Sequence, residues 1–226
     1  LFLAAVILLG VEHLQQTGRW SFDLDALTHL PLGHGTQTFV FFALALACAV
    51  KSPIFPFHSW LPLAYGEASP SGTALMAGVM SKMGAFGFIK LVLPLAPDVA
   101  PAMAPAVMVL AAVSIVYGAV LALRQAHFKQ LVAYASLSHM GYIVLGVFAF
   151  QATAAHGAMF QILSHGLSVA GLFLMLGLLQ QRCGPAYMQV NALATRAPRF
   201  AVVLMLFVLA SLALPLSSGF TAEFMI

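Results

Sequence analysis

The chain has 226 residues, of which 62% are hydrophobic and 7% are charged, and its mean hydropathy is +1.00. Soluble domains carry roughly 25% charged residues, so nine Lys or Arg and six Asp or Glu are too few to cover a water-soluble surface. The net charge of +3 comes from basic residues scattered between apolar runs, which form no patch for a nucleic acid. The composition therefore predicts a protein embedded in a lipid bilayer and excludes a nucleic-acid partner.

Apolar runs of transmembrane length follow one another along the chain. A spanning helix needs about 20 mostly apolar residues. This rule predicts one partial and six full segments: Leu1 to Leu14 (partial), Thr36 to Glu67, Ser71 to Leu95, Pro101 to Leu123, Lys129 to Phe150, Ala154 to Gln181 and Pro198 to Ile226. A polar connection, Gln15 to Gly35, follows the partial segment. The pattern predicts an all-α, polytopic transmembrane helix bundle in a single membrane domain, residues 1–226.

Both chain ends lie within apolar runs. Leu1 has no charged region before it, which is not the pattern of a signal peptide. We expect each end to cut through a transmembrane helix, so that the chain is a fragment of a longer subunit.

Two of the segments contain helix breakers. The second carries Pro53, Pro56 and Pro62, and the last carries Leu214 to Gly219, which includes Pro215. Proline removes a helix hydrogen bond, and the carbonyls it frees are tolerated in a membrane only where protein or a wet cavity satisfies them. We expect two discontinuous helices about 160 residues apart, a spacing typical of transporters built from repeats.

The basic residues of the connections indicate orientation. Positive loops stay in the cytoplasm. If every segment crosses once, one side carries Arg124, Lys129, Arg182, Arg196 and Arg199, and the opposite side carries Arg19, Lys90, Asp23, Asp25 and Asp98. We predict that the first group is cytoplasmic.

Few ionisable residues remain within the predicted spans, namely Lys51, Lys82, His139, His165 and Glu223. A charge at the bilayer centre costs several kcal/mol by the lowest scales, so each needs a partner or water. Each also has a purely structural interpretation, since a histidine can be a hydrogen-bonded core residue and Lys51 can extend to an interface. Burial disfavours the charged form of an amine, which lets a lysine exchange protons near neutral pH, where histidines already titrate. The five residues together predict a proton relay.

Several ordered motifs give a resemblance to a known family. The run Lys51-Ser-Pro-Ile-Phe-Pro-Phe-His58-Ser-Trp60-Leu-Pro62 resembles the signature of the antiporter-like subunits of NADH:quinone oxidoreductase, respiratory complex I. The resemblance continues through Glu67 to Thr73, Lys82 to Gly87, Tyr117-Gly118, Lys129 to Gly141, Ser164 to Leu167 and Pro215 to Phe224. Among the three antiporter-like subunits, the motifs are most similar to those of subunit M, also called chain 4. Leu63, Tyr65, Pro70 and His127 depart from the usual pattern, and none of them is a predicted relay residue.

The resemblance implies a subunit of fourteen helices with two inverted five-helix repeats, of which this chain would hold about the sixth to the twelfth helix. It implies that Lys51 is the lysine at the first break and Lys82 the neighbouring relay lysine. His139 and His165 would be the central histidines, and Glu223 the exit-side acid. The family's glutamate partner of the first lysine would lie before Leu1.

The resemblance also implies a function. We expect a proton-translocating subunit, with sodium as the alternative ion, in the inner or plasma membrane of a bacterium. Its partners would be the lipid bilayer and the other membrane-arm subunits of complex I, which hold NADH, FMN, iron-sulfur clusters and quinone. This chain has no cysteine cluster or glycine-rich strand-turn-helix, so we predict no cofactor, metal or redox centre in it. The alternatives are an Mrp-type cation/proton antiporter subunit, a subunit of a membrane-bound hydrogenase or plastoquinone-linked complex, and a scaffold bundle.

Overall fold

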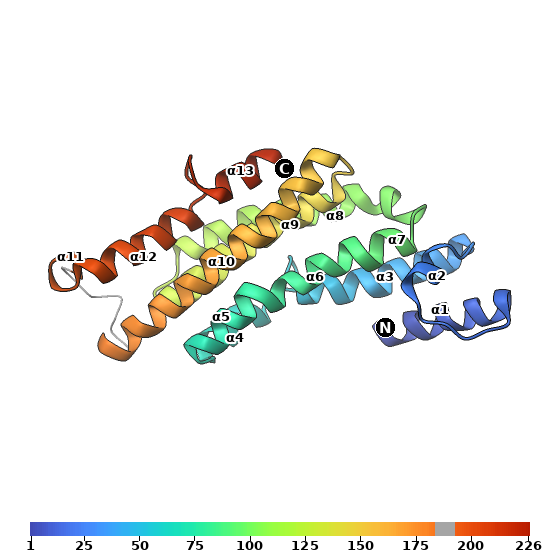
Figure 1. The fold of residues 1–226 in the computed structure, drawn as a ribbon, viewed down its shortest axis with the longest axis horizontal. Helices are drawn as coiled ribbons and strands as arrows, with labels where there is room; N and C mark the ends of the chain where they lie inside the picture. Colours follow the sequence, from blue (N-terminus) through green and yellow to red (C-terminus); the bar gives the residue numbers. More distant parts are fainter. Residues whose placement is uncertain (184–192) are drawn as a thin grey trace.

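The computed structural model describes residues 1–183 and 193–226, and all regular structure in these ranges is helical. The elements are α1 (Phe2–Thr17), α2 (Leu24–Thr28), α3 (His34–Lys51), α4 (Trp60–Glu67), α5 (Pro70–Leu75), η1 (Met76–Met80), α6 (Ser81–Gly87), η2 (Phe88–Val92), α7 (Leu93–Leu95), α8 (Val99–Leu123), α9 (Phe128–Phe148), α10 (Ala152–Cys183), α11 (Leu193–Arg196), α12 (Pro198–Ser211) and α13 (Ser218–Met225). Figure 1 shows an elongated bundle whose long helices run roughly along its long axis. The predicted all-α bundle is confirmed.

Five helical runs in the described part are long and apolar enough to cross a membrane: α3, Pro70–Leu95, α8, α9 and α10. The predicted partial segment at the start corresponds to α1, which continues to Thr17. The predicted polar connection is shorter than expected, because α1 ends within it and α2 lies inside it. The last predicted segment is divided between α12 and α13.

The first predicted helix break is present between α3 and α4. The chain leaves the helix at Ser52, passes Pro53 and Pro56, and resumes a helix at Trp60. Neighbouring groups take up the freed backbone atoms: the Ser114 hydroxyl of α8 accepts from the Phe55 N–H at 2.7 Å, and the Trp60 indole donates to the Val50 carbonyl at 3.0 Å. Side chains of α8 and α4 thus stabilise the backbone of the break inside the bundle.

The second predicted break separates α12 from α13. Helix α12 ends at Ser211, and Ala213 and Leu216 adopt positive φ angles of 48° and 80° before α13 begins. The Ser217 hydroxyl caps α13 by accepting from the Phe220 N–H at 3.3 Å. Both discontinuous helices of the prediction are confirmed.

The run that carries Lys82 is not the regular helix that the apolar pattern predicts. Two π-helical turns, η1 and η2, lie on either side of α6. The Ser81 hydroxyl donates to the Ala77 carbonyl at 2.9 Å, and the Lys82 ammonium donates to the same carbonyl, so polar side chains share the backbone acceptors of η1. Single π turns of this kind often lie at functional positions.

Small residues let the helices approach closely. A Cβ atom at Gly118 of α8 would lie 2.9 Å from the Tyr134 carbonyl oxygen of α9, and one at Gly141 of α9 would lie 2.8 Å from the Ala111 carbonyl oxygen of α8. Packing through small residues is the usual way in which membrane helices associate, because lipid supplies no hydrophobic drive between them.

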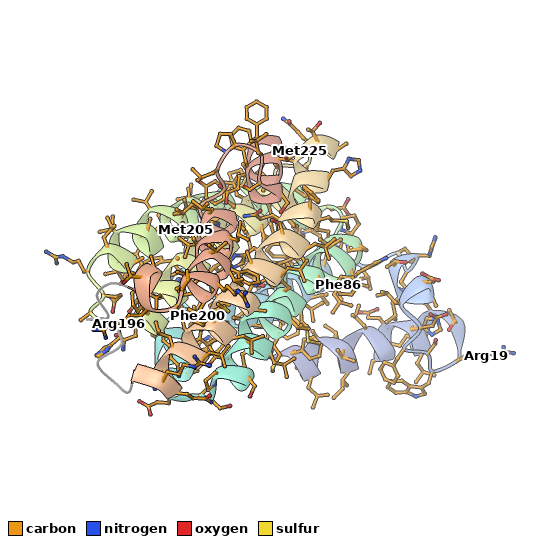
Figure 2. All side chains as sticks on the ribbon, turned by 60° about the vertical axis from the view of Figure 1, so that its left-hand side comes forward. Arg19, Phe86, Arg196, Phe200, Met205 and Met225 are labelled. Carbon is orange, nitrogen blue, oxygen red and sulfur yellow. The ribbon has the colours of Figure 1, made fainter. Side chains whose placement is uncertain are left out.

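The charged connections sort to the two ends of the bundle. Phe128 at the start of α9, Leu179 near the end of α10 and Leu193 of α11 line one cavity, so the connections beside them share an end. Figure 2 shows Arg196 and Arg19 at opposite ends of the molecule. This arrangement agrees with the predicted grouping of charges, and the cytoplasmic assignment of the first group stays a prediction.

Lys129 lies at the start of α9, as the predicted segment from Lys129 to Phe150 implies. It is buried in the first turn of α9, and its ammonium donates to the Ala68 carbonyl at the end of α4 at 3.1 Å. A cation is disfavoured at a helix N-terminus and favoured at a C-terminus, so the end of α4 offsets the unfavourable position in α9. This contact ties the second half of the first broken helix to α9.

We predict that Gly84→Ala destabilises the protein, because its Cβ atom would lie 2.6 Å from the Ser52 nitrogen and 2.7 Å from the Cys48 carbonyl oxygen. Overpacking of this kind costs about 1–3 kcal/mol. The melting temperature of the purified protein in detergent measures the effect. The matched control is Gly66→Ala in α4, where no atom lies within 4 Å of the added Cβ. Equal melting temperatures for both variants would contradict the close contact between α6 and the first break.

Candidate functional site

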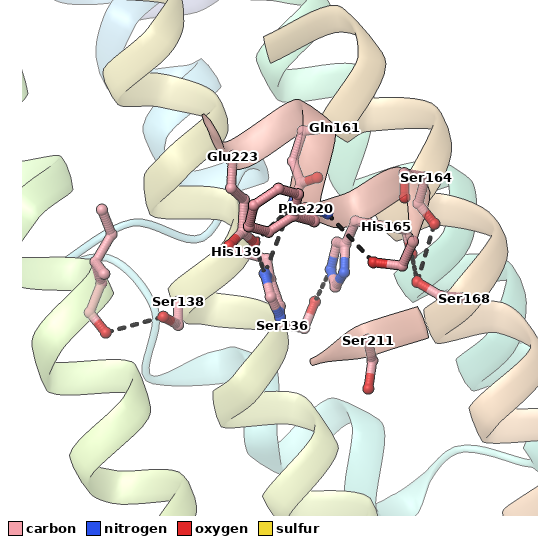
Figure 3. Close-up of polar contacts among 12 residues, drawn as sticks. Ser136, Ser138, His139, Gln161, Ser164, His165, Ser168, Ser211, Phe220 and Glu223 are labelled. Carbon is pink, nitrogen blue, oxygen red and sulfur yellow. Dashed lines mark hydrogen bonds and ion pairs between the residues drawn. The ribbon is translucent and has the colours of Figure 1, made fainter. Parts of the chain in front are cut away.

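A polar cluster joins three helices in the centre of the second half of the bundle (Figure 3). His139 of α9 contacts Glu223 of α13, with 2.8 Å between Nδ1 and Oε1. Gln161 of α10 donates from Nε2 to the same Glu223 oxygen at 2.8 Å and lies 3.4 Å from His139 Nδ1. The side chains of His139 and Glu223 are 16% and 19% exposed, which leaves the pair mostly shielded.

His165 extends the cluster along α10. Its ring centroid lies 4.8 Å from that of His139, with 36° between the ring planes. The His165 Nε2 atom is 3.0 Å from the Ser136 hydroxyl of α9, and both residues are buried. The structure therefore brings together three of the five predicted relay residues: His139, His165 and Glu223.

Lys82 lies on the side of α10 opposite to the cluster of His139, Gln161 and Glu223. Its side chain is buried and donates to the Ala77 carbonyl and to the Ser81 hydroxyl, the latter at 3.2 Å. A Cβ atom at Gly166, the residue after His165, would lie 3.9 Å from Lys82 Cε. Lys82 therefore packs against α10 directly beside His165, without a hydrogen bond to it.

Lys51 is not part of this cluster. It ends α3 at the first break, is partly buried, and has no hydrogen bond or ion pair with any described residue. The next residue, Ser52, contacts the carbonyl of Ser81 at 3.5 Å. The first break thus touches the helix turn that carries Lys82, while the Lys51 side chain remains unpaired within the described chain.

The second break positions Glu223. After the break at Leu212 to Ser217, α13 continues in roughly the direction of α12 (Figure 1) and lies against α10. The Ser218 and Ser164 hydroxyls form a hydrogen bond of 2.7 Å across this contact. A Cβ atom at Gly157 would lie 2.9 Å from the Ala222 carbonyl oxygen, so a glycine of α10 permits the close approach. The break places a carboxylate beside two histidines.

Two hollows reach the relay residues. A cavity of about 330 Å³ lies between α9, α10, α11 and α12, and its walls are apolar except for Ser136, His139, His165 and Ser211. A more open groove of about 720 Å³ between the α5–α6 run and α10 includes Lys82 and Gly166. The two hollows lie on either side of the α10 segment that carries His165.

This arrangement can exchange protons. An imidazole hydrogen-bonded to a carboxylate can pass a proton to it, and a second imidazole nearby can supply the first through one bridging water. No group of three or more His, Cys, Asp or Glu with a geometry suited to a metal ion occurs in residues 1–183 and 193–226. The described chemistry is that of acid and base groups.

Comparison with known proteins adds to this geometry. All 226 residues match the family model described as "NADH:quinone oxidoreductase/Mrp antiporter, TM". The chain belongs to this family. It is accordingly a multi-pass membrane protein.

The proteins that this chain resembles are longer than the chain itself. It is 40% identical over 210 residues to NADH-quinone oxidoreductase subunit M of Rickettsia typhi, a match that covers 91% of this chain and 42% of that protein. A chain of respiratory complex I from Thermus thermophilus with bound NADH is 38% identical, with a TM-score of 0.89 over 99% of this chain and 47% of that one. A chain of the Mrp complex from Dietzia sp. is 25% identical, with a TM-score of 0.84 over 97% of this chain and 24% of that one. The chain thus spans less than half the length of these family members.

Two members of the cluster were not predicted from the sequence. Gln161 lies four residues before His165, and Ser136 lies three residues before His139. Residues at these spacings share a helix face. A search for polar residues one turn from each intramembrane histidine would have found both.

We predict that His139→Gln and Glu223→Gln each lower the melting temperature of the protein, because each leaves its partner in a shielded site without its hydrogen bond. The double variant should lose less than the sum of the singles, with a coupling energy of about 1–3 kcal/mol. Thermal unfolding in detergent measures all three variants.

The control cycle combines His139→Gln with Glu12→Gln. Glu12 accepts a hydrogen bond from Thr36 at 3.3 Å in another part of the bundle. The effects in this control should add. Additive effects for His139 and Glu223 as well would show that the pair contributes no coupling.

Proposed function

We propose that this chain is the central part, about the sixth to the twelfth helix of fourteen, of a proton-translocating subunit of NADH:quinone oxidoreductase of the subunit M type. The observation that carries the proposal is a set of acid and base groups in consecutive positions across the bundle: the buried Lys82 and His165, and the mostly shielded His139 and Glu223. Placing several ionisable groups inside a membrane protein costs free energy, and a role in carrying protons explains why they are there.

The geometry supports an order of transfer. The proton passes from Lys82, beside the first break, across α10 to His165, which packs on His139, and then to Glu223 at the second break. Lys51 acts before Lys82 by changing the charge at the first break. Water fills the gap between Lys82 and His165, where the side chains share no hydrogen bond.

The energy for this transfer comes from other subunits. Electron transfer from NADH through FMN and iron-sulfur clusters to quinone occurs there, and this chain responds to it through the neighbouring membrane-arm subunits. The chain itself holds no redox centre in this proposal. It resides in the inner or plasma membrane of a bacterium, with the Arg196 end in the cytoplasm.

The second candidate is a cation/proton antiporter subunit of the Mrp type, which runs without a redox partner. The TM-score of 0.84 to a chain of the Mrp complex favours it. The identity of 25% to that chain, against 38% to the complex I chain and 40% to a subunit M, favours the first candidate. Proton pumping that requires NADH and is unaffected by a sodium gradient would distinguish them.

We predict that Lys82→Ala in the full-length subunit abolishes most NADH-driven proton pumping by membrane vesicles, because it removes a buried proton carrier while leaving the backbone contacts in place. The measurement is the quenching of a pH-sensitive dye on addition of NADH. The amount of assembled complex is compared on native gels.

The matched control is Lys90→Ala in η2 of the same helical run. Lys90 is exposed and belongs to no described polar cluster, so pumping should be retained. If Lys82→Ala assembles and pumps like the wild type, the buried ammonium is structural and the proposed function fails.

A further inference from the structure

Gln161 is among the most deeply buried polar residues of the bundle. Its side chain is 2% exposed, and its amide faces the His139–Glu223 pair (Figure 3). An amide cannot carry a proton in this pH range, so Gln161 has no place in the relay itself. A buried amide in a membrane protein is nevertheless costly, and its contacts indicate why it is present.

The contacts determine which way the amide points. Nε2 lies 2.8 Å from Glu223 Oε1 and 3.4 Å from His139 Nδ1, whereas Oε1 has no hydrogen-bond partner within the described residues. The reverse orientation would place the amide oxygen against a carboxylate oxygen, so that two acceptors would face each other. Gln161 therefore acts as a donor, and its NH₂ group has two hydrogens to give.

The number of donors matters because the pair changes its protonation. While a proton lies between His139 Nδ1 and Glu223 Oε1, one atom donates to the other across 2.8 Å. Once that proton has left for the next acceptor, both atoms are acceptors at the same distance and repel each other. The two N–H groups of Gln161 can then donate to both atoms at once.

We propose that Gln161 is a positioning residue that stabilises the emptied His139–Glu223 pair and so allows the pair to release its proton. The inference rests on the proposed function, because it assigns Gln161 a role in the relay described above. Gln161 neither accepts nor gives a proton. It supplies hydrogen bonds that the pair needs only after release.

Other titratable groups face the pair and remain unchanged in the test. His165 of α10 stacks on His139, and Lys82 of α6 packs beside His165. Tyr142 of α9 interacts electrostatically with Glu223. Helix α12 contributes Ser211, and α13 contributes no titratable group besides Glu223. A change in pH dependence on replacing Gln161 can therefore be assigned to its hydrogen bonds.

The test is the pH profile of NADH-driven proton pumping in the assembled complex, with the full-length subunit carrying Gln161→Met or Gln161→Leu. Met keeps the length of the side chain without its hydrogen bonds. Leu also lacks hydrogen bonds, and neither replacement adds a titratable group. On the acid side of the profile, pumping rises with pH as the pair becomes able to release its proton. We expect the half-maximal point of this limb to move to higher pH, by about one unit, in both variants.

The control is Gln125→Met at the end of α8, whose amide donates only to the Leu121 carbonyl of its own helix, at 2.9 Å. Its profile should match the wild type. If Gln161→Met fails to assemble, Gln161→Leu decides. A uniform loss of pumping at every pH, with the acid limb in its original place, would show a merely structural role and overturn the inference. Wild-type pumping by Lys82→Ala would instead overturn the proposed function, whatever the Gln161 variants do.

Discussion

Lipid offers no hydrogen-bond partner, so polar atoms within the bundle depend on the protein for theirs. The two breaks obey this constraint through Ser114, Trp60 and Ser217, which take up freed backbone groups. The Lys82 ammonium obeys it by donating to the Ala77 carbonyl of the preceding π turn, η1, and to the Ser81 hydroxyl. At both breaks, side chains thus replace some of the partners that the interrupted helix lacks.

The acid and base groups meet just after the second break. There α13 lies against α10, where small residues allow backbone contact and the Ser164–Ser218 hydrogen bond joins the two helices. Glu223 thereby meets His139, 84 residues earlier in the chain.

Much of this architecture is readable from local signals. The prolines Pro53, Pro56 and Pro62 predicted the first break, and Pro215 with the serines that follow it predicted the second. Apolar runs predicted the spans. Breaks and spans can be predicted in this way because each depends on residues adjacent in the sequence. The π turns around Lys82 were not predictable, because the apolar pattern does not reveal which backbone carbonyls accept from side chains, as Ala77 does from Ser81 and Lys82. The pairing of His139 with Glu223 and the donor role of Gln161 depend on contacts between helices distant in sequence. The sequence indicated the five ionisable residues, and only the fold showed that Lys51 stands apart from the cluster.

Lys129 gives the bundle a mechanical link between its halves. Its ammonium holds the last carbonyl of α4, while its backbone belongs to the first turn of α9, the helix that carries His139. The Trp60 indole of α4 also donates to the Val50 carbonyl of α3, so α4 is tied to α3 as well as to α9. The short helix after the first break is thereby a bridge between the helix that ends at Lys51 and the helix that carries His139.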